Sequence, residues 1–76
     1  MTYEQYLQQA NVYFVFNQEH LRYGQALANH LSRFSPIAYV AVCAADKDPF
    51  YVDALVPEFL DFLSSNWATI TQPARA

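Results

Sequence analysis

The sequence has few cysteines and histidines, which excludes the usual covalent and metal reinforcements of a small domain. Cys43 is the single cysteine among 76 residues, so no disulfide can form within the chain. His20 and His30 do not have the short paired ligand spacings of a structural zinc site. We therefore expect no cofactor and no metal, and a core that depends on large side chains or on self-association.

Basic residues and export or membrane signals are also scarce. Four Lys and Arg against seven Asp and Glu give a net charge of −3, and the basic residues do not cluster. Because phosphate affinity depends on Lys and Arg, we expect no nucleic-acid binding. The longest apolar run, 37–45, is too short to span a bilayer, and residues 1–6 lack the features of a signal peptide. Together with the unpaired cysteine, this predicts no membrane association and a cytoplasmic location.

Side chains suited to catalysis are equally few. Cys43 lies inside the apolar run, where a cysteine is more often a small core residue than a nucleophile. His20 and His30 are ten residues apart on one expected helix, about 80° away from a common face. The carboxylates Asp46 and Asp48 lie close in sequence, but nothing indicates a pocket around them. We therefore predict a non-enzymatic protein with no catalytic residue.

Aromatic residues, by contrast, are abundant and fall at helical spacing. Six Tyr, six Phe and one Trp can each remove about 150–250 Å² from water when buried. Turn signals at Asn17, 35–36, 46–49 and Pro57 divide the chain into segments of helical length. The sequence predicts an all-α fold, a compact bundle of about four short helices spanning residues 2–16, 17–35, 36–45 and 55–67. We expect residues 1–68 to form a single domain, followed by a flexible C-terminal tail over 69–76.

The first segment has an apolar stripe with i, i+3, i+4 spacing from Tyr3 to Phe14, and Thr2 with Gln5 matches a capping box. Three apolar residues, Val12, Val15 and Phe16, lie off this stripe. They form either an exposed patch for a partner or for self-association, or Phe16 packs on Leu21 as a hydrophobic staple before an N-cap at Asn17. The sequence leaves both alternatives open.

Two features of the middle of the chain need an explanation. Gly24 costs about 1 kcal/mol relative to Ala in a helix interior, which a close helix crossing would offset. Residues 37–45 are β-branched and continuously apolar, as in a buried strand. Their only pairing partner, 12–16, would give an isolated two-stranded unit, so we predict a short buried helix instead.

Polar residues on the second helix and acidic residues after the third form two further groups. Arg22, Gln25 and Asn29 share one side of the second helix. They form either a recognition patch or, as we favour, a structural cluster in which Arg22 pairs with an acid of 46–53 and the amides bond the loop backbone. Five of the seven acids lie between 46 and 61, where they form either a solvated face or a surface for a basic partner: Asp46, Asp48, Asp53, Glu58 and Asp61.

Three short motifs follow one another over about residues 20–67. They are Arg22-x-Gly24-Gln25-Ala26-Leu27-x-Asn29-x-Leu31, Asp48-Pro49-Phe50-Tyr51-x-Asp53 and Pro57-x-Phe59-Leu60. In this order and spacing they resemble a group of short uncharacterised proteins from phages and prophages. The first helix lies outside the resemblance, and the third segment is more β-branched than we expect of that group.

The resemblance implies a setting, a phage or prophage accessory protein inside a bacterial host cell, and by analogy a protein that binds a host or phage protein, with inhibition as one outcome. The alternative is a self-assembling structural or scaffold protein, a homo-oligomer whose main partner is itself. The residues that we expect to contact a protein partner are Val12, Phe16, Asp46, Asp48, Asp53, Glu58 and Asp61.

Overall fold

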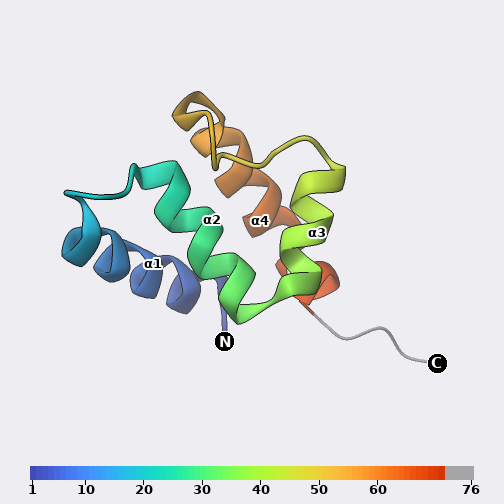
Figure 1. The fold of residues 1–76 in the computed structure, drawn as a ribbon. Coiled ribbons are helices and arrows are strands. Elements are labelled where there is room, and N and C mark those ends of the chain that lie inside the picture. The colour runs from blue at the N-terminus through green and yellow to red at the C-terminus, as the bar shows by residue number, and fades with distance from the viewer. Residues whose placement is uncertain (72–76) are drawn as a thin grey trace.

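Helices make up the regular structure of this protein (Figure 1). The computed structural model describes residues 1–71, which contain the α-helices α1 (Tyr3–Asn17), α2 (Tyr23–Phe34), α3 (Pro36–Ala44) and α4 (Val56–Thr71), with a short 3-10 helix η1 (Asp53–Leu55) before α4. No strand occurs in this part of the chain. The predicted all-α bundle of four short helices is thus confirmed. None of these helices is long and apolar enough to cross a membrane, a finding that covers residues 1–71.

The helix α2 occupies the middle of the bundle (Figure 1). Helix α1 packs chiefly on α2, and α3 joins α2 to α4 on the side away from α1. The loop between α3 and α4 passes back over the start of α2. One face of α1 is therefore held against the bundle, while its opposite face has no helix of residues 1–71 packed on it.

The main hydrophobic cluster of the core takes two buried residues from each helix, and α2 adds buried Ala26 and Ala28 outside this cluster. The cluster residues are Tyr6 and Ala10, Leu27 and Leu31, Ala38 and Val42, and Phe59 and Leu63. The buried Tyr6 hydroxyl donates to the carbonyl of Leu27 at 2.6 Å, which satisfies a polar group that burial would otherwise penalise. Burial raises the pKa of Tyr6, so this hydroxyl keeps its proton. The aromatic stripe of the first segment therefore packs into the core as its spacing predicts.

Local capping explains where α1 and α3 begin. The Thr2 hydroxyl accepts from the amide of Gln5 at 3.1 Å, and the Gln5 carbonyl oxygen Oε1 accepts from the amide of Thr2 at 2.8 Å, which completes the predicted capping box. The hydroxyl of Ser35 accepts from the amide of Ala38 at 3.2 Å, and Pro36 occupies the first position of α3. Residues 36–44 are therefore a helix, as predicted, and the strand alternative is excluded. The expectation that this helix is buried was wrong, because only Ala38 and Val42 are buried and Ile37 and Val40 are exposed.

The start of the second helix differs from the prediction. Asn17 does not cap α2 but ends α1, because its side-chain amide donates to the carbonyl of Tyr13 at 2.8 Å. The Asn17 carbonyl accepts from the amides of His20 and Leu21, and these bonds close a turn between the helices. Helix α2 begins only at Tyr23. The predicted boundary at 17 was wrong because the Asn17 side chain bonds backward along α1.

The end of the last helix also differs. Helix α4 continues to Thr71 rather than ending at 67, and the Thr71 hydroxyl donates to the carbonyl of Trp67 at 2.6 Å. The Trp67 indole nitrogen donates to the carbonyl of Met1 at 2.9 Å, and Ile70 packs against the core. The predicted tail 69–76 is therefore helical over 69–71, and its remaining part, 72–76, lies outside the described residues.

Candidate protein-binding surface

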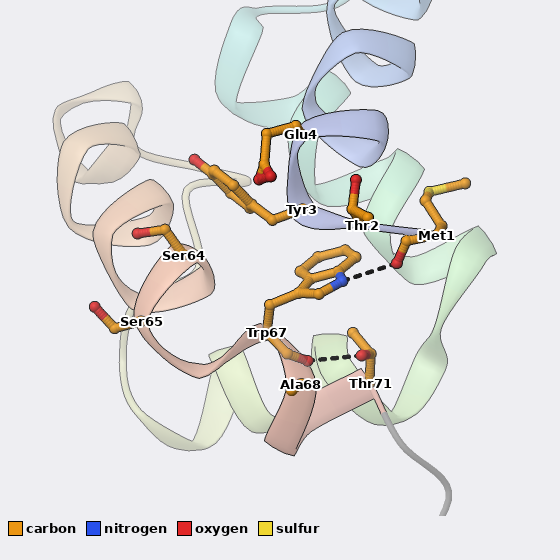
Figure 2. A pocket seen from close by; sticks show the side chains of 9 residues that line it. All are labelled: Met1, Thr2, Tyr3, Glu4, Ser64, Ser65, Trp67, Ala68 and Thr71. Atoms are coloured by element: carbon orange, nitrogen blue, oxygen red, sulfur yellow. Dashed lines mark hydrogen bonds between the residues drawn. The ribbon is translucent and has the colours of Figure 1, made fainter.

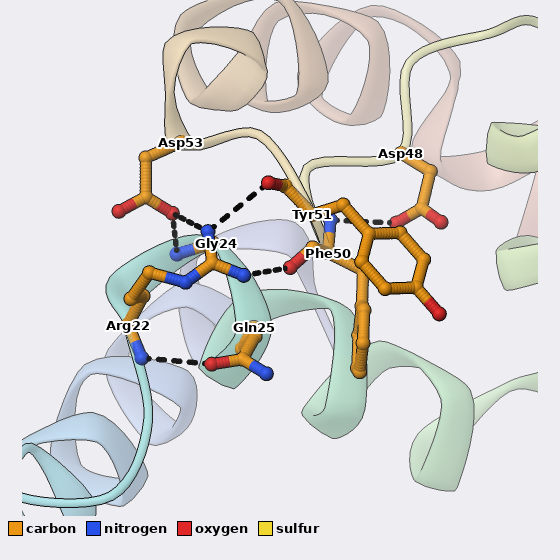
Figure 3. Close-up of polar contacts among 7 residues, drawn as sticks. All are labelled: Arg22, Gly24, Gln25, Asp48, Phe50, Tyr51 and Asp53. Atoms are coloured by element: carbon orange, nitrogen blue, oxygen red, sulfur yellow. Dashed lines mark hydrogen bonds and ion pairs between the residues drawn. The ribbon is translucent and has the colours of Figure 1, made fainter.

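A polar junction joins the start of α2 to the loop before α4 (Figure 3). The Arg22 guanidinium donates to the carbonyls of Phe50 at 2.7 Å and Tyr51 at 3.2 Å. It also lies 3.4 Å from Oδ1 of Asp53, and the same oxygen accepts from the amide of Gly24 at 3.1 Å. These contacts agree with the structural interpretation of Arg22 as the partner of an acid in the 46–53 loop.

Gly24 is where this loop approaches α2 most closely. A Cβ at Gly24 would collide with the carbonyl oxygen of Pro49 and lie 2.6 Å from Oδ1 of Asp53. The side chain of Pro49 is fully buried, so this segment of the loop is seated on α2. The prediction of a close helix crossing at Gly24 was wrong in its partner, because the approaching backbone belongs to a loop.

The two amides of the predicted polar cluster do not bond the loop. Oε1 of Gln25 accepts from the amide of Arg22 at 3.1 Å, because the third residue of a helix is placed to reach back to the N-cap. The half-buried Asn29 makes no side-chain hydrogen bond to any other residue within 1–71. Only Arg22 of this cluster reaches the loop, so the predicted bonds of Gln25 and Asn29 to the loop backbone do not form within residues 1–71.

Two of the five candidate acids accept hydrogen bonds that hold the α3–α4 loop. Asp53 is held by Arg22 and Gly24. Asp48 accepts from the hydroxyl of Tyr39 at 2.9 Å and from the amide of Phe50 at 3.0 Å. Such bonds fix the course of the α3–α4 loop.

Of the other three acids, one is in an ion pair and two are exposed. Glu58 pairs with Lys47 at 3.0 Å across the start of α4. Asp46 follows α3 in a left-handed conformation with φ 58°, and Asp61 lies exposed on α4. The acidic stretch is therefore divided between loop-fixing contacts and two separate exposed carboxylates.

Cys43 is exposed at the end of α3, so its expected place in the core was wrong; the neighbouring Val42 is the buried residue. Its sulfur lies 3.8 Å from Oδ2 of Asp48. Burial of the sulfur and the nearby Asp48 carboxylate raise the pKa of the Cys43 thiol, although a contact with Tyr39 acts in the opposite direction. The thiol therefore stays protonated at neutral pH. Within residues 1–71 no three His, Cys, Asp or Glu side chains come together as metal ligands.

A groove opens between the N-terminal residues and the last turns of α4 (Figure 2). Trp67 and Tyr3 line it, with their ring centres 5.9 Å apart and edge to face, and hydroxyls of Thr2 and Ser64 lie at its rim. Glu4 contributes the carboxylate of this groove. The groove is wide open to solvent, and within residues 1–71 no hydrogen bond joins the Glu4 carboxylate to a hydroxyl of the lining.

The outer face of α1 carries a contiguous set of exposed apolar side chains. Val12 is 52% exposed, Val15 is 59% exposed and Phe16 is 82% exposed. At about 100° per residue, Val12 and Val15 lie on the side of α1 opposite the buried Tyr6 and Ala10, and Phe16 lies on the flank of that side, about 80° from Tyr6. The predicted staple does not form, because Phe16 is in water and α2 begins only at Tyr23.

Five other large apolar residues within 1–71 are exposed, and they lie elsewhere; one of them is Met1, which precedes α1. Ile37 and Val40 are on α3, on the other side of α2 from α1, and Tyr51 and Val52 are in the loop before α4. Among the exposed large apolar side chains of residues 1–71, Phe16 of the α1 patch is the most exposed, and aromatic residues are enriched in protein interfaces. Comparisons with protein-family models, curated proteins and solved structures found no match for this chain.

Proposed function

We propose that this chain is a non-enzymatic accessory protein of a phage or prophage that binds a host or phage protein in the bacterial cytoplasm. The docking surface is the outer face of α1, which we define as Val12, Val15 and Phe16 with the amides beside them. The observation that carries the proposal is the 82% exposure of Phe16 on a helix whose inner face is held in the core. Burying a Val or Phe side chain stabilises by about 1.5–3 kcal/mol, so an exposed set of this kind favours a bound state.

The roles of the motif residues support this choice of surface. Arg22, Gly24, Asp48 and Asp53 belong to the motifs of the phage resemblance. Arg22, Gly24 and Asp53 meet at the α2–loop junction, and Asp48 bonds Tyr39 of α3 and the amide of Phe50 in the same loop. The presence of these residues in the motifs is explained by the contacts that fix the α3–α4 loop. The α1 helix lies outside the resemblance, so in this proposal the shared motifs build the scaffold and α1 carries the specificity of this chain.

The test is an affinity capture from bacterial lysate at moderate salt, with Phe16→Asp compared against Val40→Asp. Val40 is a matched control because it is 65% exposed, apolar and helical, but lies on α3. Both variants should keep the fold, since substitutions at exposed positions usually change stability by about 0.5 kcal/mol or less. We expect a stoichiometric partner with the wild-type chain and with Val40→Asp, and its loss with Phe16→Asp. Equal capture by all three proteins would contradict the proposal.

A further inference from the structure

We draw no further inference here: the strongest candidate, the groove between the N-terminal residues and the last turns of α4, is wide open to solvent, and nothing in the structure of residues 1–71 shows what covers it.

Discussion

Gly24→Ala tests the α2–loop junction most directly, because the added Cβ has two opposite effects on the free energy of unfolding. It raises helix propensity, and it overlaps with the loop. In an unobstructed helix the change stabilises by up to about 1 kcal/mol, since alanine has the higher helix propensity. Here the new Cβ would collide with the Pro49 carbonyl oxygen and would lie 2.6 Å from Oδ1 of Asp53 and 3.2 Å from Cβ of Pro49. The sign of the change in unfolding free energy therefore reports whether the loop is seated on α2.

The structure sets the magnitude. The Pro49 carbonyl is backbone, and the Pro49 side chain is fully buried, so the loop cannot withdraw without exposing that ring. Inserting a methyl group into a filled site costs about 1–3 kcal/mol. A shifted loop also weakens the Gly24–Asp53 hydrogen bond, which adds about 1 kcal/mol. After the propensity gain is subtracted, we expect a net destabilisation of about 2 kcal/mol.

Urea and thermal denaturation followed by circular dichroism measure this directly. For a domain of this size, 2 kcal/mol corresponds to a fall in Tm of about 8–16 °C. Ser65→Ala, at an exposed position of α4, serves as a control and should change stability by about 0.5 kcal/mol or less. A Gly24→Ala protein that is as stable as the wild type, or more stable, would refute the close approach of the Pro49 segment to α2.

Two further predictions concern Arg22 and His30. Arg22→Met removes the donors to the carbonyls of residues 50 and 51, and because the ion pair with Asp53 is half-exposed and contributes little, we expect a loss of about 1 kcal/mol by urea denaturation. Arg22→Lys should not restore it, since the ammonium lacks the planar fork; full rescue by lysine would contradict this reasoning. The His30 ring lies between Tyr6 and Tyr13, and its burial, followed by the nearby Arg33, lowers the pKa of His30 below 6.5. As pH falls below 6.5 the unfolded chain takes up a proton that the folded chain resists, so stability is lost toward acid pH. His30→Phe should therefore lose less stability than the wild type between pH 7.5 and 5.5 in thermal melts, and equal losses would count against the shift.

The features that the sequence predicted correctly depend on residues three or four positions apart. The capping box of Thr2 and Gln5, the apolar stripe of α1 and the Ser-Pro start of α3 are of this kind. Such patterns are fixed by helix geometry alone, whatever lies next to the helix. The helix count followed from them, whereas a strand over 37–45 was rejected because its only pairing partner, 12–16, would have given an isolated two-stranded unit.

For contacts between distant segments, the sequence predicted the type of interaction but not the partner residue. Opposite charge indicated that Arg22 would meet an acid of the 46–53 loop, but not that Asp53 is the partner, 31 residues away. The reason for Gly24 was also missed, because a glycine in a helix indicates a close approach without naming the backbone that approaches. Both depend on the path of the α3–α4 loop, which is set by buried Pro49 and by the bonds of Asp48 rather than by local spacing.

Whether Phe16 is exposed depends on which hydrogen bond the Asn17 side chain makes, and the sequence left two alternatives open. As an N-cap of α2, Asn17 would have placed Phe16 over Leu21 in a staple; its amide instead donates to Tyr13 within α1. These alternatives differ by about one side-chain hydrogen bond, on the order of 1 kcal/mol, which is too small for sequence patterns to rank. Because Asn17 prolongs α1, the helix carries Phe16 outward to its exposed position, and α2 starts too far along the chain to cover it. The proposed docking face of α1 is therefore exposed because the Asn17 amide donates to the carbonyl of Tyr13 and does not cap α2.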